Sequence, residues 1–379
     1  MAIDLDEVRA RLSARGQQPR PAEVADALTW LGHVVSDASV LATVDALRRE
    51  SRGAGPLEGL LQLSGVTDVV VNGPDEVWLD RGAGLERSEV RFASDEAVRR
   101  LAVRLAAMVG RRLDDASPFV DARLPDGTRV HAVLACVAER TCVSLRVPAR
   151  VHLSLDDWVE RGSLSPRGAA VLRGLVHRRR AVLVSGGTGS GKTTLLAAVL
   201  GEVGPTERLV VVEDSRELNP VHPHVVRMEG RASNAEGVGA VTLTELVRNA
   251  LRMRPDRLIV GEVRGAELCD LLAALNTGHE GGWGTVHANT ATSVPARLEA
   301  LGALGGLGRS ALHAQVVAAL DAVVHVRRDR SGARYVGQVG VFVPGEAGVA
   351  CVASALEWDA SGACREGPGA EALFELVGA

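Results

Sequence analysis

The chain has 379 residues and a formal net charge of −4 at pH 7, with 46% hydrophobic and 24% charged residues. Its length predicts two or three domains with a substantial core, and the acidic balance, without any block of basic residues, argues against direct nucleic-acid binding. The five cysteines form no Cys-x-x-Cys pair, which favours free thiols over a zinc site or a disulfide framework.

No basic-then-apolar signal segment opens the sequence, and no apolar run approaches the ~20 residues that span a bilayer. These features predict a cytoplasmic protein that reaches a membrane only through a partner.

Residues 1–55 are expected to be a helical extension. Apolar residues recur at helical spacing at Ile3, Leu5, Val8 and Leu12. Two further apolar stretches, 22–35 and 38–48, follow a break at Pro19–Pro21.

Residues 56–147 change to a mixed α/β pattern and are predicted to form a small N-terminal domain. A short strand at 68–71 ends in Asn-Gly-Pro, and a helix follows a Ser94 cap. A turn at 125–127 separates further strands, and residues 148–155 read as a linker.

Residues 156–345 alternate strand and helix, which is typical of a parallel sheet with crossover helices. Ser165-Pro166 and the capping box Thr242-x-x-Glu245 predict two helix starts, and buried strands are expected at 181–185, 209–212 and 258–260. Residues 346–379, rich in Gly, Ala and Glu, are expected to be a peripheral tail.

The predicted strand at 181–185 runs directly into G-x-x-x-x-G-K-[ST], the P-loop pattern that cradles nucleoside triphosphates. Its residues are Gly186, Gly187, Thr188, Gly189, Ser190, Gly191, Lys192 and Thr193. Lys192 is the only lysine in the chain, at a place where a compact ammonium must reach between the β- and γ-phosphates. Thr193 is expected to ligate Mg²⁺, and Thr194 follows it into the helix.

Carboxylates end two later strands. In a parallel sheet these ends lie beside the P-loop, so Glu213 and Asp214 are expected to face the metal and the γ-phosphate. Glu262 could orient or deprotonate the attacking water, and it follows Gly261 where a Walker B motif usually has aspartate. Magnesium would then depend on Thr193, water, and Glu213 or Asp214; spacing alone leaves open whether Glu213 or Glu262 is the base.

Two histidines flank a glycine-rich turn that leads into another predicted strand. His287 could sense or contact the γ-phosphate, and His279 is a second candidate for nucleotide binding. Considered alone, such a pair is more often structural than catalytic.

The ordered set of motifs resembles the secretion ATPase superfamily of type II and type IV secretion machines. It comprises the P-loop, Val-Glu213-Asp214, Val-Gly261-Glu262-Val-Arg-Gly265, and Gly-His279 through Thr-Val-His287-Ala-Asn289. The resemblance implies an α/β fold with a RecA-like P-loop NTPase domain, and it explains Gly261, since glycine is usual there in this superfamily.

The N-terminal domain is similar to that of CpaF-like ATPases, which drive Tad (Flp) pilus assembly. The matching segments are residues 66–74 and 117–130, with Asp68 where the family commonly has glutamate. No tetracysteine insertion is present, which favours the Tad or conjugation branch.

The resemblance implies a homo-hexameric ring that uses ATP and Mg²⁺ and works on an inner-membrane platform protein. It also implies arginines that contact the nucleotide phosphates. The candidates are Arg123, Arg129 and Arg146 in the N-terminal domain, and Arg227 and Arg231 after Asp214.

Two alternatives stay open. One is a DNA-translocating P-loop motor, which the acidic charge and the lack of a DNA-binding module disfavour. The other is a nucleotide-binding scaffold without turnover, although all the expected hydrolytic residues are present.

Overall fold

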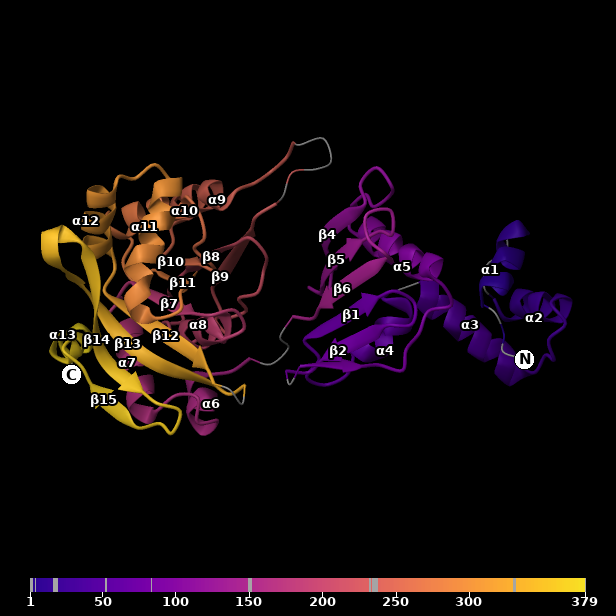
Figure 1. Ribbon diagram of the computed structural model, residues 1–379, viewed down its shortest axis with the longest axis horizontal. Helices are drawn as coiled ribbons and strands as arrows, with labels where there is room; N and C mark the ends of the chain where they lie inside the picture. Colours follow the sequence, from indigo (N-terminus) through magenta and orange to yellow (C-terminus); the bar gives the residue numbers. More distant parts are fainter. Residues whose placement is uncertain are drawn as a thin grey trace. The chain divides into compact units, whose positions relative to one another are not determined.

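The structure, a computed structural model, describes residues 3, 5–15, 20–51, 53–82, 84–148, 152–231, 233, 238–329 and 332–378. The chain divides into two compact units, residues 1–148 and 149–379 (Figure 1). Among the described residues, no helix is both long and apolar enough to cross a bilayer.

Three helices open the first unit and share a small core of their own. They are α1 (Leu5–Ala14), α2 (Pro21–Trp30) and α3 (Asp37–Ser51). The second helix is shorter than the apolar stretch predicted. Gly32 takes φ +78°, and the N–H of His33 donates back to the carbonyl of Leu28 at 3.0 Å, which closes the helix near Trp30.

A six-stranded antiparallel sheet with one covering helix makes up the rest of this unit. The chain order is η1 (Gly55–Leu57), α4 (Glu58–Leu61), β1 (Asp68–Asn72), β2 (Val77–Asp80), β3 (Leu85–Arg87), α5 (Asp95–Met108), β4 (Phe119–Arg123), β5 (Arg129–Val133) and β6 (Cys142–Arg146). The strand order is β3-β2-β1-β6-β5-β4. The Ser94 hydroxyl accepts a hydrogen bond from the N–H of Ala97, which confirms the predicted cap of α5.

The second unit is built on a nine-stranded sheet in the order β15-β14-β13-β12-β7-β11-β10-β8-β9. Its strands are β7 (Val182–Gly186), β8 (Leu209–Glu213), β9 (Val225–Glu229), β10 (Arg257–Val260), β11 (Trp283–His287), β12 (Ala322–Arg328), β13 (Arg334–Pro344), β14 (Ala350–Trp358) and β15 (Cys364–Glu366). The strands from β12 to β9 in this order are parallel, and β13, β14 and β15 add an antiparallel edge.

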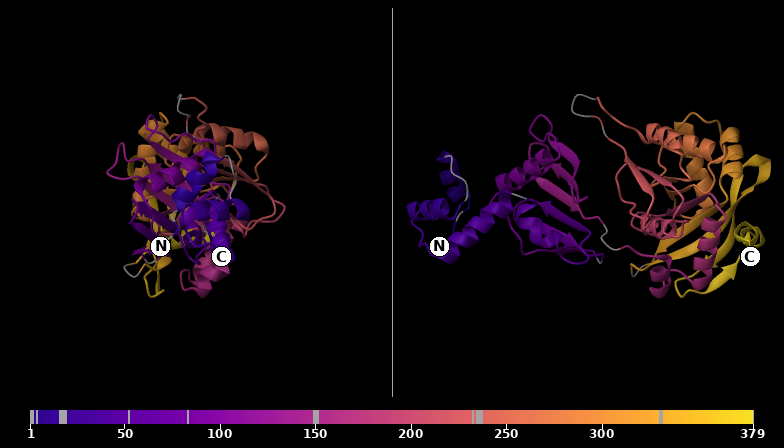
Figure 2. Two further views of the ribbon diagram at one scale, coloured as in Figure 1. Left: turned by 90° about the vertical axis from the view of Figure 1, so that its right-hand side faces the viewer. Right: turned by 180° about the vertical axis from the view of Figure 1, so that it is seen from behind.

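Helices cover both faces of this sheet (Figures 1 and 2). One face packs on α6 (Leu155–Glu160), α7 (Pro166–His177), α8 (Lys192–Leu200) and α13 (Ala370–Val377). The other packs on α9 (Leu243–Ala250), α10 (Glu267–Leu275), α11 (Val294–Leu304) and α12 (Arg309–Ala319), with short turns η2 (Leu251–Met253), η3 (Ala291–Ser293) and η4 (Glu346–Gly348) between elements.

The sequence signals for two helix starts in this unit are confirmed. Ser165 accepts from the N–H of Gly168, and Thr242 with Glu245 forms the predicted capping box.

The prediction of a peripheral tail at residues 346–379 is wrong. β14 pairs with β13 along its length, and Leu356, Trp358 and Leu373 are buried in the core beside α7. The high glycine and alanine content of this segment gave no clear strand pattern. The strand that forms there, β14, covers β13 with its apolar residues. A domain that ended at residue 345 would leave β13 without its neighbour.

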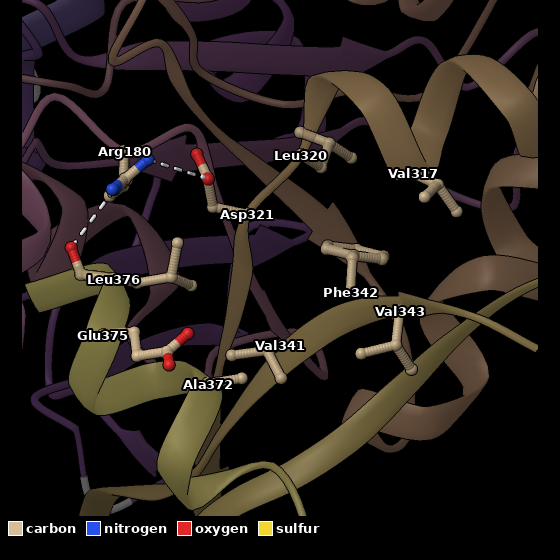
Figure 3. Close-up of a pocket in the computed structure, with 10 residues that line it drawn as sticks. All are labelled: Arg180, Val317, Leu320, Asp321, Val341, Phe342, Val343, Ala372, Glu375 and Leu376. Atoms are coloured by element: carbon tan, nitrogen blue, oxygen red, sulfur yellow. Dashed lines mark hydrogen bonds and ion pairs between the residues drawn. The ribbon is translucent and has the colours of Figure 1, made fainter.

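One cavity, of about 330 Å³, lies beside the start of β12 (Figure 3). Its walls are mainly apolar residues of α12, β13 and α13, and Asp321 closes one end by accepting from the N–H of Ala181 at 2.7 Å and pairing with Arg180 at 3.5 Å. The parallel strands β7 and β12 both begin beside the cavity. The cavity therefore lies at the N-terminal ends of these strands, whereas the P-loop follows the C-terminal end of β7.

Candidate nucleotide-binding site

The P-loop leaves β7 at Gly186 and enters α8 at Lys192. A Cβ on Gly186 would stand 2.5 Å from the carbonyl oxygen of Val326 and 2.6 Å from Ser190 Oγ, so only glycine fits this turn. Gly191 caps α8 in the left-handed region with φ +99°. Arg334 Nε donates to the carbonyl of Gly189 at 2.9 Å and holds the exposed side of the loop.

Lys192 folds back under the loop. It is 7% exposed, and its Nζ donates to the carbonyl of Gly187 at 3.0 Å. Burial lowers the pKa of this ammonium, while the charges of Glu262 and Glu217 oppose the shift. The hydrogen bond to Gly187 therefore holds the side chain against the loop.

His287 connects the lysine to the carboxylate predicted to activate water. Its Nε2 lies 2.9 Å from Glu262 Oε1, and Lys192 Nζ lies 3.4 Å from Nδ1 and 3.5 Å from Nε2. A carboxylate can only accept, so in the neutral ring Nε2–H donates to Glu262, while the ammonium lies against the ring at nearly the same distance from both nitrogens. Burial and the Lys192 charge lower the pKa of His287, against the opposing charge of Glu262. Both His287 and Glu262 keep 38% side-chain exposure, as a site open to substrate requires.

Glu213 lies at the same edge, but its side chain is only 4% exposed. Its Oε1 accepts from the N–H groups of Glu217 and Leu218 at 3.0 and 2.9 Å, which fastens the loop after β8. A Cβ on Gly261 would lie 2.5 Å from Glu213 Cγ, so the absent side chain at 261 makes room for this carboxylate. The sequence predicts that Glu213 faces the metal. In the structure its side chain is instead hydrogen bonded to backbone N–H groups of the following loop.

Asp214 forms an ion pair with Arg264, the residue two positions after Glu262. The pair ties the end of β8 to the loop after β10. Its carboxylate is thus neutralised beside the site, in contrast to Glu262.

The sequence reasoning missed Glu217. The charge of this carboxylate, like that of Glu262, opposes the lowering of the pKa of Lys192. The available signal was the spacing Glu213-x-x-x-Glu217, which places a second acid one short loop beyond the strand end.

His279 does not join the group. It precedes β11, whereas His287 ends it, and β11 is parallel to β7 with His287 opposite Gly186. The length of the strand, at ~3.3 Å per residue, therefore separates His279 from the P-loop of the same chain. The prediction that His279 helps to bind this nucleotide does not agree with its place before the N-terminal end of β11, at the opposite end of the strand from His287.

The three arginine candidates of the first unit form one row across its sheet. Arg123 is the cross-strand partner of Arg129, and Arg129 is the partner of Arg146. Directly paired residues point to the same face, so the guanidinium groups are neighbours on the face opposite α5. Arg146 pairs with Asp68 at 3.0 Å, and Arg129 lies 3.6 Å from Asp121.

Arg227 and Arg231 follow Asp214 at the β9 edge. Arg227 hydrogen bonds Asn219, and Arg231 Nε donates to the carbonyl of Gly239 at 2.8 Å. Neither reaches the P-loop through a contact within the described residues.

If the P-loop binds nucleotide with Mg²⁺, the residue of this chain that would hold the ion is Thr193, directly after Lys192. No group of three or more His, Cys, Asp or Glu gathers as a metal cage in the part of the chain that the structure describes. Mg²⁺ in ATPase sites takes one or two protein ligands and completes its shell with phosphates and waters. The hydroxyl of Thr193, in the first turn of α8, could supply one such ligand.

Comparison with known proteins agrees with this geometry. A family model described as "Type II/IV secretion system protein" matches residues 50–343. The chain is 55% identical over 326 residues to a protein of Mycobacterium tuberculosis named "Putative conjugal transfer protein", covering 84% of this chain and 93% of that one. It is 35% identical over 298 residues to the type IV secretion system protein PtlH homolog of Bordetella bronchiseptica, covering 71% and 88%.

Solved structures share the fold. The DotB ATPase of Yersinia pseudotuberculosis superposes with a TM-score of 0.55 at 16% identity, covering 78% of this chain and 79% of that one. The pilus retraction motor PilT with bound ADP gives 0.52 at 19% identity, covering 76% and 78%. With a family model spanning most of the chain and relatives this similar over most of their length, the chain belongs to the type II/IV secretion ATPase superfamily, with a RecA-like P-loop domain and a smaller N-terminal domain.

Proposed function

We propose that this protein hydrolyses MgATP and uses the released energy to drive a secretion or pilus machine. The observation that carries the proposal is the connected set Lys192, His287 and Glu262 beside the P-loop. It joins a phosphate-binding cation to an exposed carboxylate through a histidine, which is what in-line attack by a positioned water needs.

The residues divide the work as follows. The loop amides and Lys192 hold the β- and γ-phosphates, and Thr193 would hold Mg²⁺, which neutralises charge on the phosphates when bound. Glu262 orients the water or accepts its proton. His287, between Lys192 and Glu262, is placed to respond when the γ-phosphate leaves.

Glu262 is our assignment for the base, and the contrast with Glu213 supports it. Glu213 is buried and already accepts two backbone N–H groups, while Glu262 is exposed and bonded only to a histidine among the described contacts. Glu217 supplies a further negative charge that acts on the pKa of Lys192.

We infer further that the protein acts as a homo-hexamer at the inner face of the cytoplasmic membrane, on an inner-membrane platform protein. The names of its relatives, a conjugal transfer protein and a type IV secretion system protein, support a machine of the type IV class. The similarity of residues 66–74 and 117–130 to CpaF-like ATPases favours Tad pilus assembly. We propose that Arg123, Arg129 and Arg146 contribute cations to phosphate binding.

The test is Mg²⁺-dependent phosphate release, measured for the purified parent protein and for the Glu262→Gln variant. The matched control is His279→Asn, because His279 lies at the opposite end of β11 from His287. We expect Glu262→Gln to lower kcat by about 10²-fold or more, since general-base contributions have that size, with nucleotide binding retained. His279→Asn should keep the parent kcat at saturating ATP. Specific activity that rises with protein concentration would indicate a site completed by assembly.

Three results would redirect the assignment. Equal rates for the parent and Glu262→Gln would remove Glu262 from the chemistry. Nucleotide binding without turnover in the parent would favour a scaffold, and stimulation by DNA would favour a translocating motor.

A further inference from the structure

The ends of β12 and β13 extend past the sheet beside the P-loop. Val326 of β12 lies opposite Gly186 of β7, the residue at which the P-loop begins. β12 then continues to Arg328, and at ~3.3 Å per residue this carries Arg328 beyond the last paired residue of β7. These strand ends therefore flank the P-loop at the C-terminal end of the parallel strands.

Two arginines face each other across these strand ends. Arg328 is the antiparallel partner of Arg334, and the next pair on the same face is Val326 with Val336, which are buried in the core around α8. Side chains two residues apart on a strand share a face, so both arginines lie on the face of the sheet that packs on α8. Both are exposed. They are thus on the side of the sheet where the P-loop leads into its helix.

Arg334 is attached to the P-loop itself. Its Nε donates to the carbonyl of Gly189 at 2.9 Å. A Cβ on Gly191 would lie 3.3 Å from Arg334 Cδ and 3.5 Å from Cη2 of Trp158, so the aliphatic part of the arginine packs against the loop next to a buried indole. Within the described residues, no hydrogen bond or ion pair engages its two Nη groups. The side chain is held at the loop while most of its donors remain available.

The two arginines have no acidic partner in the part of the chain that the structure describes. The acid that directly follows Arg328 is Asp329, and its Oδ1 accepts from the N–H of Ala333 at 2.9 Å. Like charges directly opposite each other on paired strands destabilise a sheet. Two such cations beside a phosphate-binding loop therefore indicate that an anion completes their surroundings.

We propose that Arg334, with Arg328 beside it, binds phosphate oxygens of the nucleotide held by the P-loop of the same chain. This inference rests on the proposed function and adds a ligand-binding residue to its site. Arg334 makes the direct contact, because its Nε is fixed on the loop and its Nη groups can donate to phosphate oxygens. Arg328 contributes positive charge. Neither residue is among the arginines that the sequence predicts to contact the nucleotide.

Nucleotide binding tests the assignment without any need for turnover. The full-length parent, Arg334→Gln and Arg328→Gln are titrated with methylanthraniloyl-ADP in the presence of Mg²⁺. We expect the Kd to rise about tenfold or more for Arg334→Gln, the loss typical of a hydrogen bond to a charged group. For Arg328→Gln we expect a rise of about two- to threefold, because it acts through charge at an exposed position.

Arg327→Gln is the matched control. Arg327 is exposed and lies next to Arg328, but it points to the other face of the sheet, where its Cδ stands 2.6 Å from the position of a Cβ on Gly337. This variant should keep the parent Kd. A loss in Arg327→Gln as large as that in Arg334→Gln would show a general effect of the strand ends and contradict the assignment.

Salt distinguishes a phosphate contact from a role in shaping the loop. The bond to the Gly189 carbonyl involves a neutral acceptor, so a purely loop-shaping arginine would leave the salt dependence of the Kd unchanged. A phosphate contact instead makes the parent Kd rise more steeply with KCl than that of Arg334→Gln. Arg334→Lys, which keeps the charge, should recover part of both the affinity and the salt dependence. Parallel salt dependences, or an Arg334→Gln variant with the parent Kd, would overturn the proposal.

Protein concentration identifies whose nucleotide is bound. The weaker binding of Arg334→Gln should be the same at low and high protein concentration. A loss seen only where copies associate would assign the arginine to the nucleotide of a neighbouring copy and overturn the same-chain assignment.

The same titrations keep this inference separate from the ATPase proposal. If the parent binds methylanthraniloyl-ADP but never releases phosphate from ATP, and Arg334→Gln binds more weakly, the ATPase proposal fails and the assignment of Arg334 stands. If the parent turns over and Arg334→Gln keeps the parent Kd, the reverse holds. A parent that binds no nucleotide would overturn both.

Discussion

Gly261 occupies the position where a Walker B strand usually places a metal-binding aspartate, and the reason is steric. The side chain of Glu213, on the neighbouring parallel strand, fills the space that a Cβ at 261 would need. Glu213 in turn accepts the N–H groups that would otherwise be left without partners in the loop after β8. One missing side chain therefore permits the buried carboxylate next to it.

Gly261→Ala should destabilise the second unit. The new Cβ would stand 2.5 Å from Glu213 Cγ and 3.1 Å from Cδ, so we expect a loss of about 1–3 kcal/mol in the free energy of unfolding, the size typical of overpacking. Urea denaturation followed by tryptophan fluorescence measures it.

Glu213→Ala removes the colliding atoms and serves as the control. The double variant Gly261→Ala/Glu213→Ala should then be no less stable than Glu213→Ala alone. Strictly additive losses would show that the two residues do not compete for the same space.

The sequence could locate these carboxylates but not orient them. A strand-end acid beside a P-loop predicts a residue near the phosphates, and the structure shows Glu262 bonded to His287, which lies against Lys192 of the P-loop. Whether an acid faces the nucleotide or the adjacent loop depends on which neighbour leaves room and which backbone groups need a partner. For Glu213, both are set by contacts between strands, which spacing does not reveal.

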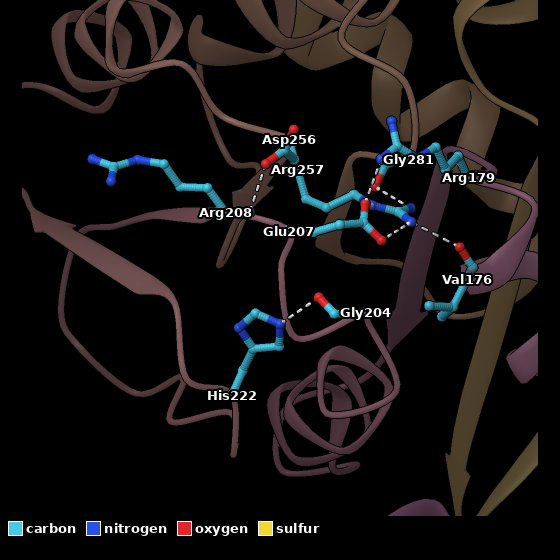
Figure 4. Close-up of polar contacts among 9 residues, drawn as sticks. All are labelled: Val176, Arg179, Gly204, Glu207, Arg208, His222, Asp256, Arg257 and Gly281. Carbon is cyan, nitrogen blue, oxygen red and sulfur yellow. Dashed lines mark hydrogen bonds and ion pairs between the residues drawn. The ribbon is translucent and has the colours of Figure 1, made fainter.

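At the N-terminal ends of the parallel strands, away from the P-loop, a buried arginine holds four segments together (Figure 4). Arg257, at the start of β10, is 2% exposed. Its guanidinium lies 2.8 Å from Glu207 and donates to the carbonyl of Val176 at 3.0 Å and, more weakly at 3.5 Å, to that of Gly281. The ends of α7, the loop before β8 and the lead into β11 are thus fixed to β10.

Arg257→Met should be costly. It keeps most of the side-chain volume but leaves two carbonyls without their buried donor and Glu207 with Arg179 as its remaining partner, and breaking a buried pair in this way costs up to about 3–5 kcal/mol. The measurement is the urea midpoint of unfolding, converted with the parent's m-value.

Arg179→Met is the matched comparison, since Arg179 also pairs with Glu207 at 2.8 Å but is about half exposed. Its cost should stay within about 1 kcal/mol, as for other surface pairs. Similar losses in both variants would contradict the role assigned to burial.

Among the elements, those with a strong local signal were predictable. Continuous apolar runs identified β7, β8 and β10, and side-chain caps marked the starts of α5, α7 and α9. β14 was not predicted, because its small residues become a buried strand only when β13 and α13 pack against them. Such burial is a property of the assembled sheet.

For the molecule as a whole, the antiparallel edge is expected to be indispensable. Removing residues 346–379 would take away β14, β15 and α13 and expose β13, a long and largely buried strand, to water. We expect this truncation to yield aggregated or unfolded protein, because an uncovered apolar edge strand is a template for association. Soluble yield and circular dichroism report the outcome.

Removal of residues 1–51 is the control. These residues supply α1–α3, whose buried side chains form a core of their own. The shortened chain should keep the unfolding midpoint of the second unit. A soluble, fully folded product of the C-terminal truncation would show that β14 is dispensable after all.

The arginine-for-lysine composition has a chemical consequence for the whole surface. Of 43 lysine and arginine residues, the one side-chain amine is Lys192, and it is buried beneath the P-loop. Guanidinium groups stay charged at every pH that a folded protein survives, so the arginine charge of the surface does not titrate. Acylating or cross-linking reagents that react with side-chain amines therefore have no exposed lysine to modify, and the single lysine of the chain is the buried one that we propose to hold phosphate.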